Sequence, residues 1–229
     1  MAVSWYVNTI ETPLLDLVRA YCFPAGEDAA RRIRAVRIAE RGEMQTAPQA
    51  RPIGFTAEME IDARASRFRW AAQFRGGLRL FSVVDAYENG RGRLSLRAAA
   101  LPLKTMAGPD FDRGELLRYL ASFALCPPML LNHPSLVWTP AGPHAIELRD
   151  GDAALELQFD DSGCPAAFRG ERPRTVGSRA VTTGWSGRAA GFREWDGIRV
   201  AGQTEASWHL DGGPFLYYRS DVTAVTTLL

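Results

Sequence analysis

Residues 66–75 read SRFRWAAQFR, and apolar and polar side chains alternate along this stretch. Phe68, Trp70, Ala72 and Phe74 fall on one side of an extended chain, and arginines and a glutamine fall on the other. A period of two is typical of a strand in an antiparallel sheet that has one buried and one solvated face. The stretch therefore predicts a half-buried strand whose apolar side faces the core of the protein.

The same kind of pattern continues on both sides of this strand. Residues 52–101 predict a meander of about four strands or more, with a hairpin turn at Asn89-Gly90 and an end to the strands at Pro102. From residue 136 onward strand patterns resume, separated by turn signals such as Asp150-Gly151. We count roughly ten or eleven strands, and a sheet of that size must curl, close or split.

Helical periodicity interrupts the strands in the middle of the chain. Residues 112–131 read DRGELLRYLASFALCPPMLL and predict a helix pair with Asp112 as N-cap and Glu115 three residues later. Cys126-Pro127-Pro128 predicts a break within the pair. Because strands precede and follow this segment, we expect it to lie in the concave face of one curved sheet.

The N-terminal residues predict helices instead of strands. Residues 9–23 show apolar positions at helical spacing, and a second short helix is expected over 27–35. We therefore predict an α+β, mostly β, fold: a half-barrel wrapped around a central helix pair, with an N-terminal helix. A single domain over 1–229 is expected, with the helical segment in 1–35 and the curved sheet in 36–229.

Composition excludes several classes of protein. The 229 residues include 27 basic and 26 acidic side chains, a balance that argues against a nucleic-acid binder. The three cysteines form no CxxC pair and the three histidines form no metal-binding motif, and we find no nucleotide-binding loop. Apolar stretches are too short to span a bilayer. We expect a cytoplasmic protein without cofactor, metal or membrane span, and the oligomeric state is left open.

Several separate segments resemble an uncharacterised bacterial family, a domain of unknown function that occurs as a stand-alone soluble protein. The matching segments are Phe68-Arg69-Trp70, residues 85–92 (DAYENGRG), residues 114–120 (GELLRYL), Val137-Trp138, residues 184–187 (GWSG), residues 206–208 (ASW) and residues 213–219 (GPFLYYR). The chain departs from the family at Ser122, where members tend to have an acid, and at Leu125, where they tend to have tryptophan. The expected shape is similar to the lipoprotein-carrier half-barrel, which implies a hollow that holds acyl chains.

Aromatic and basic residues are the candidate ligand-binding groups. Most of the tryptophans are expected in the core, but the functional alternative is a pocket lined by large rings for a flat or apolar molecule. If the central helix lies in the concavity, its arginine would face buried carboxylates or an anionic head group instead of solvent. The candidates are Trp70, Arg118, Tyr119, Trp138, Trp208 and Tyr217.

Three residues are candidates for acid–base chemistry. Asp85 and Tyr87 stand just before the Asn89-Gly90 turn and would serve as base and hydrogen-bond donor at a cavity mouth. The alternative is that they only stabilise the turn. His209 is the third candidate because imidazole titrates near neutral pH, although its side of the strand can equally be solvated.

Two hypotheses on function follow from a curved sheet with an apolar hollow. The first is a protein that binds an apolar small molecule or lipid, and the second is a cofactor-free enzyme of cyclase or isomerase type that acts on an apolar substrate. Both need an enclosed apolar cavity with a few placed polar groups. A module that binds a partner through an exposed sheet edge is a third possibility.

Overall fold

The computed structural model describes residues 13–76, 79–98, 101–177 and 179–229. Its helices are α1 (Pro13–Cys22), α2 (Glu27–Arg32), α3 (Pro109–Ala121), the 3₁₀ turn η1 (Ser122–Ala124) and α4 (Met129–Asn132). Its strands are β1 (Ala35–Met44), β2 (Ile53–Asp62), β3 (Phe68–Gly76), β4 (Arg79–Glu88), β5 (Arg91–Ala98), β6 (Leu101–Met106), β7 (Val137–Gly142), β8 (Ala145–Asp150), β9 (Ala153–Phe159), β10 (Pro165–Val176), β11 (Arg179–Ala190), β12 (Arg193–Trp195), β13 (Ile198–Val200), β14 (Gln203–Leu210) and β15 (Gly213–Leu228).

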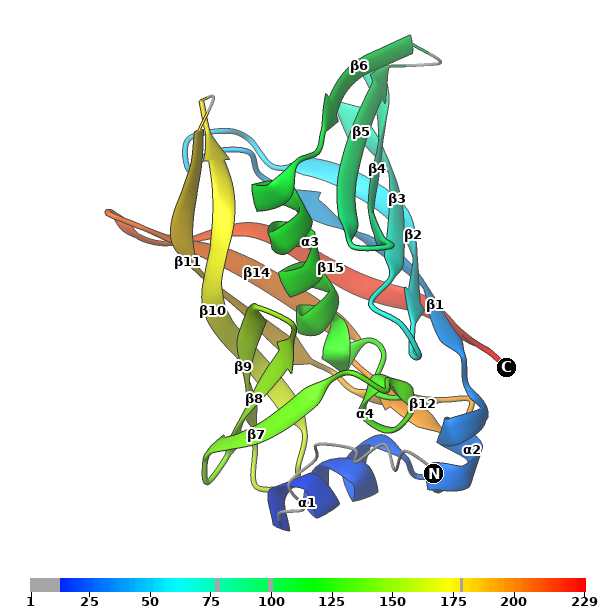
Figure 1. The fold of residues 1–229 in the computed structure, drawn as a ribbon. Helices are drawn as coiled ribbons and strands as arrows, with labels where there is room; N and C mark the ends of the chain where they lie inside the picture. The colour runs from blue at the N-terminus through cyan, green and yellow to red at the C-terminus, as the bar shows by residue number, and fades with distance from the viewer. Residues whose placement is uncertain (1–12, 77–78, 99–100, 178) are drawn as a thin grey trace, which may run out of the picture.

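One antiparallel sheet makes up most of the molecule and curls around α3 (Figure 1). Within the described residues it has thirteen strands in the order β6-β5-β4-β3-β2-β1-β15-β14-β11-β10-β9-β8-β7, and β12 and β13 form a separate pair. The two halves of the chain are joined where β1 pairs with β15, from Ala35 opposite Leu228 to Met44 opposite Tyr218. The predicted mostly β half-barrel with an N-terminal helix is confirmed.

The strand count is larger than predicted, because short strands escape a search for long alternating runs. β12 and β13 have three residues each, and β6 contains Pro102, where we expected the strands to stop. Proline lacks the N–H group that an inner strand would donate, but β6 is an edge strand and pairs on one side with β5 alone.

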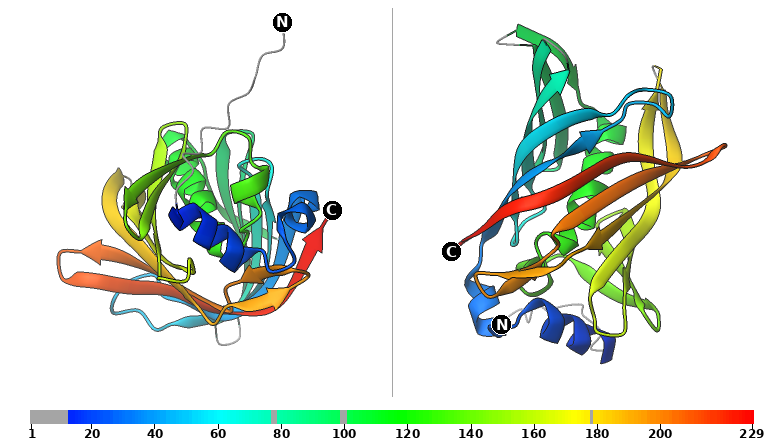
Figure 2. Two further views of the ribbon diagram at one scale, coloured as in Figure 1. Left: turned by 90° about the horizontal axis from the view of Figure 1, so that it is seen from below. Right: turned by 180° about the vertical axis from the view of Figure 1, so that it is seen from behind.

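The helix α3 lies inside the curl of the sheet, as the view from below shows (Figure 2). It begins at Pro109, earlier than predicted, and Asp112 does not cap it. The Asp112 carboxylate instead accepts a hydrogen bond from the Gly92 backbone N–H at 2.7 Å, which ties the helix to the β4–β5 hairpin. The predicted break is confirmed, since η1 and α4 are separate elements on either side of Pro127.

The N-terminal helices cover one end of the half-barrel (Figures 1 and 2). α1 begins at Pro13, and residues 9–12 of the predicted helix lie outside the described residues. α2 is shorter than predicted because Ile33 is extended, with φ −72° and ψ 120°, and leads directly into β1. On α1, Leu15 and Val18 are buried and help to close this end of the core.

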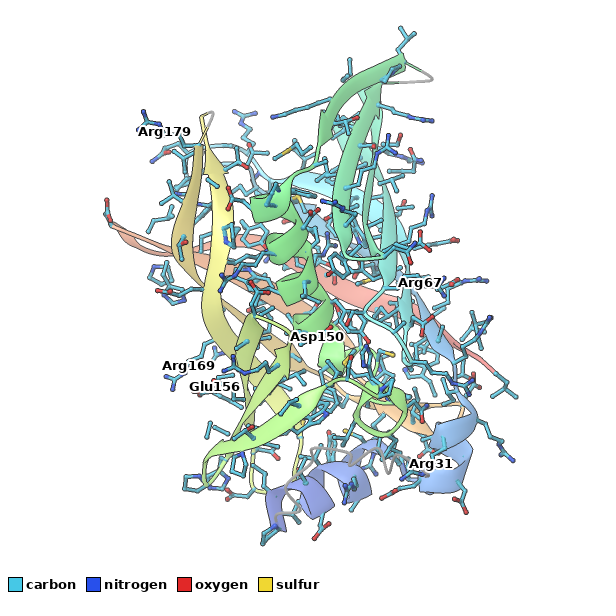
Figure 3. The ribbon with its side chains drawn as sticks, in the orientation of Figure 1. Arg31, Arg67, Asp150, Glu156, Arg169 and Arg179 are labelled. Atoms are coloured by element: carbon cyan, nitrogen blue, oxygen red, sulfur yellow. The ribbon has the colours of Figure 1, made fainter. Side chains whose placement is uncertain are left out.

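A polar contact also holds the two halves of the sheet together at this end. Ser66, in the β2–β3 loop, donates a hydrogen bond of 2.5 Å to the Asp150 carboxylate at the end of β8, and its Oγ lies 3.1 Å from His133 Nε2. Figure 3 places Asp150 near the lower end of α3. Burial lowers the pKa of His133, which favours the neutral imidazole. Ser66 therefore lies between Asp150 and His133, and it donates its hydroxyl hydrogen to Asp150.

Replacing Gly163 by alanine is expected to destabilise the protein by about 2–4 kcal/mol, because backbone strain and a steric clash add. Gly163 has a φ of +83°, and a Cβ there would lie 2.4 Å from the Leu17 carbonyl carbon of α1. Gly151→Ala is the matched control, since Gly151 has a φ of +57° and no atom lies within 4 Å of the place that a Cβ would take. Urea unfolding should show a loss of only about 1 kcal/mol for the control. Equal losses in the two variants would contradict the close approach of α1.

Candidate functional site

A cavity of about 330 Å³ lies between α3 and the concave face of the sheet. Its walls come from both halves of the half-barrel and are mainly apolar. Met59, Leu94 and Met106 line it from the first half, and Phe168, Trp185 and Trp208 line it from the second. A larger and more open groove, of about 1170 Å³, involves residues of β1–β3 and β14–β15, among them the exposed ion pair of Arg219 and Glu43.

Four charged side chains gather on the wall of the cavity. Asp85 comes from β4, Glu115 and Arg118 from α3, and Arg172 from β10. Arg118 Nη1 donates a hydrogen bond to Asp85 Oδ2, and Arg172 Nη2 donates one of 2.6 Å to Glu115 Oε1. Arg172 Nε also donates to the Gly114 carbonyl at 2.8 Å. We call Asp85, Glu115, Arg118 and Arg172 the ionic cluster.

Aromatic rings support both arginines of the ionic cluster. The Arg118 guanidinium carbon lies 5.0 Å from the centre of the Trp70 ring and 5.1 Å from that of Phe68. Arg172 lies in the same way 4.8 Å from the Trp185 ring. A guanidinium is planar and weakly hydrated, so it lies over aromatic rings more readily than an ammonium does. Burial alone would lower the pKa of Arg118, but the carboxylates of Asp85 and Glu115 outweigh burial and raise it.

The pKa of the Asp85 carboxyl group is unusual for a side chain that is paired with an arginine. Burial, and then the negative charge of Glu115, raise its pKa to about 7, against the opposing effects of Arg118 and Arg172. Asp85 Oδ1 and Glu115 Oε2 are both buried and have no hydrogen-bond donor within the described part of the chain. A proton shared between the two carboxyl groups would satisfy both oxygens. The ionic cluster can therefore take up one proton near neutral pH.

Another buried carboxylate, that of Glu40, lies outside the lining of the cavity. Glu40 of β1 accepts hydrogen bonds from the Trp70 indole at 2.5 Å, from the Tyr218 hydroxyl at 2.8 Å and from the Ser220 hydroxyl at 2.8 Å. These donors come from β3 and β15, so Glu40 joins three strands. It orders the strand that carries Trp70, and Trp70 in turn supports Arg118.

We did not predict from the sequence that Glu40, Glu115 and Arg172 belong to the site. For Glu40 and Arg172, however, the sequence contains a signal. Glu40 follows Val36 and Ile38 on the alternating apolar side of its strand, and Arg172 follows Phe168 in the same way. A charged residue on an otherwise apolar side of a strand needs a partner inside the protein. Which partner it meets depends on the fold.

The structure brings four of the predicted ligand-binding and catalytic residues to the cavity. Asp85, Arg118, Trp208 and Tyr217 line it, and Trp70 lies directly beneath Arg118. Tyr217 accepts a hydrogen bond of 3.2 Å from the Trp185 indole and stacks on Trp208 with ring centres 5.5 Å apart. Arg118 does meet buried carboxylates, as expected for a helix in the concavity.

The other predicted residues lie elsewhere. Tyr119 is turned to the far side of α3 and donates a hydrogen bond of 2.9 Å to the Asp62 carbonyl, and Trp138 packs in the core 5.2 Å from the ring of Phe123. Tyr87 is buried at the end of β4 and is not among the lining residues of the cavity. His209 is exposed, with its Nε2 2.8 Å from Ser186 Oγ.

His209 lines a shallow depression together with Glu156 and Arg169. Figure 3 shows Arg169 and Glu156 next to each other, and their side chains form an ion pair with an N–O distance of 2.9 Å. The solvated orientation considered for the strand of His209 is therefore the observed one. Its side chain lies outside the cavity that holds Asp85.

Neither metal binding nor thiol chemistry is supported by the residues that the structure describes. The described residues contain no group of three or more side chains that could hold a metal ion, and no helix there has the length and apolar character needed to cross a membrane. Burial raises the pKa of the Cys22 and Cys126 thiols, so neither is a ready nucleophile at neutral pH.

Comparison with known proteins places the chain in a family. A model of a family of unknown function, DUF6544, matches residues 10–220, so the chain belongs to this family, which confirms the resemblance seen in the sequence. No curated protein matches.

Among the solved structures that resemble this one are three whose sequences are 9–11% identical to this chain. A DUF1329 family protein from Desulfovibrio piger has 9% identity and a TM-score of 0.48. A domain from Vibrio parahaemolyticus whose name refers to outer membrane lipoprotein sorting has 10% identity and a TM-score of 0.47. A LolA superfamily protein from Nitrosomonas europaea has 11% identity and a TM-score of 0.44. Each match covers 93% of this chain and 91% of the other. Because all three TM-scores lie below 0.5, nothing about the ligand of this chain follows from them.

Proposed function

We propose that this member of the DUF6544 family binds an apolar small molecule or a lipid chain in the cavity between α3 and the sheet. The observation that supports the proposal is an apolar cavity of about 330 Å³ with an ionic cluster on its wall. Ligand sites are usually of this kind, with mostly apolar walls and a few polar groups that orient the ligand. The volume lies at the lower end of the range for small-molecule sites, about 300–1,000 Å³.

The filling of the rest of the half-barrel strengthens this proposal. Below the cavity, Phe123 of η1 packs against Trp138 and Phe159 with ring centres 5.2 and 6.2 Å away. The apolar side chains on the cavity walls would gain dispersion contacts and lose contact with water when an apolar molecule lies against them.

Filling the cavity tests this proposal. Leu125 is buried and lines the cavity, so Leu125→Trp is expected to weaken binding of the neutral fluorescent probe N-phenyl-1-naphthylamine at least about tenfold, since one tenfold step equals about 1.4 kcal/mol of lost contact. The matched control is Leu216→Trp, because Leu216 is 40% exposed and does not line the cavity. The control should bind the probe as the wild type does. Equal affinities for the wild type and Leu125→Trp would count against the cavity as the binding site.

A cofactor-free enzyme is the second candidate, and one observation favours it. The pKa of Asp85, raised to about 7, suits a group that takes and returns a proton at neutral pH. Tyr87 and His209 are not placed to share this chemistry, since neither lines the cavity. If the protein is an enzyme, a compound that mass spectrometry finds bound to purified Asp85→Asn should be converted when it is added to the wild type and should stay unchanged with the variant. Recovery of the compound unchanged from the wild type would count against catalysis.

A further inference from the structure

We infer that the ligand carries an anionic group at one end, a carboxylate on an apolar chain or ring, and that Arg118 and Arg172 bind this group. This inference rests on the proposed function and narrows the ligand to a chemical class. It concerns the polar end of the ligand, whereas the apolar walls of the cavity hold the remainder.

Unused hydrogen-bond donors are the first argument. A guanidinium has five N–H groups. Within the described residues, Arg118 forms a hydrogen bond through Nη1 alone, to Asp85, and its side chain is 19% exposed and lines the cavity. Arg172 uses Nε and Nη2 on Gly114 and Glu115, which leaves Nη1. A carboxylate, whose two oxygens match the spacing of guanidinium N–H groups, is the natural acceptor for these donors.

The acceptors of the ionic cluster point to the same class of ligand. The two carboxylate oxygens without a donor, Asp85 Oδ1 and Glu115 Oε2, are inaccessible from the cavity because both atoms are buried. A ligand therefore meets N–H groups and not these oxygens. The charged lining residues also have a basic excess of one: Arg118, Arg172, Arg174 and Arg188 against Asp85, Glu115 and Glu205.

Proton uptake by the ionic cluster adds to the attraction for an anion. The groups that act electrostatically on Asp85 are Glu115, Arg118 and Arg172. When Asp85 takes up a proton, a negative charge beside Arg118 disappears and Arg118 is free to bind an external carboxylate. Of the groups that influence Arg118, Tyr218 stays neutral because burial raises its pKa. Acidification from pH 8 to pH 6 should therefore strengthen binding of an anion, because Asp85 has a pKa of about 7.

Three probes of equal chain length test the inference: dodecanoic acid, 1-dodecanol and dodecylamine, each displacing N-phenyl-1-naphthylamine from the wild type. We expect the acid to bind at least about tenfold more tightly than the alcohol, and the amine to bind most weakly. Between pH 8 and pH 6 the affinity for the acid should rise by up to about tenfold, and the affinity for the alcohol should not change. Equal affinities for acid and alcohol would overturn the inference but leave the proposed function intact. If neither the fluorescent probe nor any of the three compounds binds, the proposed function itself fails.

Variants of the ionic cluster separate charge recognition from damage to the fold. Asp85→Asn imitates protonated Asp85, so it should bind the acid tightly at pH 8 and lose the pH dependence. The double variant Asp85→Asn/Arg118→Gln removes the ion pair as a unit and should lose at least about tenfold in affinity for the acid, with less than about threefold for the alcohol. Arg219→Gln is the control, because this exposed arginine pairs with Glu43 away from the cavity. Equal losses for acid and alcohol in the double variant, or an unchanged pH dependence in Asp85→Asn, would contradict the inference.

Discussion

Replacing Arg118 by methionine should lower the free energy of unfolding by about 3–5 kcal/mol at pH 8, the cost of leaving a buried charge without its partner. Asp85 would lose its hydrogen-bond donor, and Glu115 would lose a guanidinium whose Nη1 lies 3.9 Å from its Oε2. Methionine fills much of the space of the arginine stem, so the loss reports on the guanidinium, through its charge and its contact with the Trp70 ring, more than on packing of the stem. Urea unfolding at fixed pH measures it.

The same variant should show a characteristic dependence on pH. The pKa of Asp85 is raised above its unfolded value, so its contribution to stability is present at low pH and is lost as pH rises through about 7. Without Arg118 the pKa of Asp85 rises further, and protonation then relieves the unpaired charge. The penalty of Arg118→Met should thus be smaller at about pH 5.5 than at about pH 8.5.

Two further variants check this explanation. Asp85→Asn combined with Arg118→Met should recover a large part of the lost stability at pH 8, because the uncompensated charge is gone. Arg219→Met, which breaks an exposed ion pair, should cost less than about 1 kcal/mol. A penalty for Arg118→Met that is independent of pH and not relieved by Asp85→Asn would show that the ionic cluster is not the cause.

Replacing Glu40 by alanine should destabilise the protein by about 3 kcal/mol or more, because each buried polar group left unpaired costs about 1–3 kcal/mol. The change leaves the Trp70 indole and the Tyr218 and Ser220 hydroxyls without their common acceptor. The comparison variant is Glu43→Ala, three positions along β1, whose carboxylate is exposed and pairs with Arg219. It should change stability by less than about 1 kcal/mol. Unfolding midpoints that coincide for the two variants would contradict the role assigned to Glu40.

The local elements of this fold could be predicted from the sequence because they depend on short-range stereochemistry. The alternation in residues 66–75 predicted a strand, and Phe68, Trp70, Ala72 and Phe74 are buried as expected. Asn89 and Gly90 have φ values of 52° and 76°, the left-handed conformation that a two-residue hairpin turn requires and that these two residue types tolerate. Their position between β4 and β5 was therefore predictable from two residues alone.

The candidate site could be predicted only in part. Asp85 and Arg118 were identified as candidates, but their contact depends on how a strand of the first half meets the central helix. Arg172 and Glu115 lie 57 residues apart in the chain, and no local pattern relates them. For His209, the pattern allowed either side of the strand to face the cavity, and the structure places it outside.

By itself, the sequence determined the type of each long element and the curled sheet, since alternation and turn residues act over a few positions and many strands cannot stay flat. Only the tertiary structure decided that β1 pairs with β15 and that β11 pairs with β14. These pairings join distant parts of the chain, and their register depends on burial of whole faces and not on any local preference. They bring β4, α3 and β10 around one hollow, and so create the ionic cluster that the proposed ligand would meet.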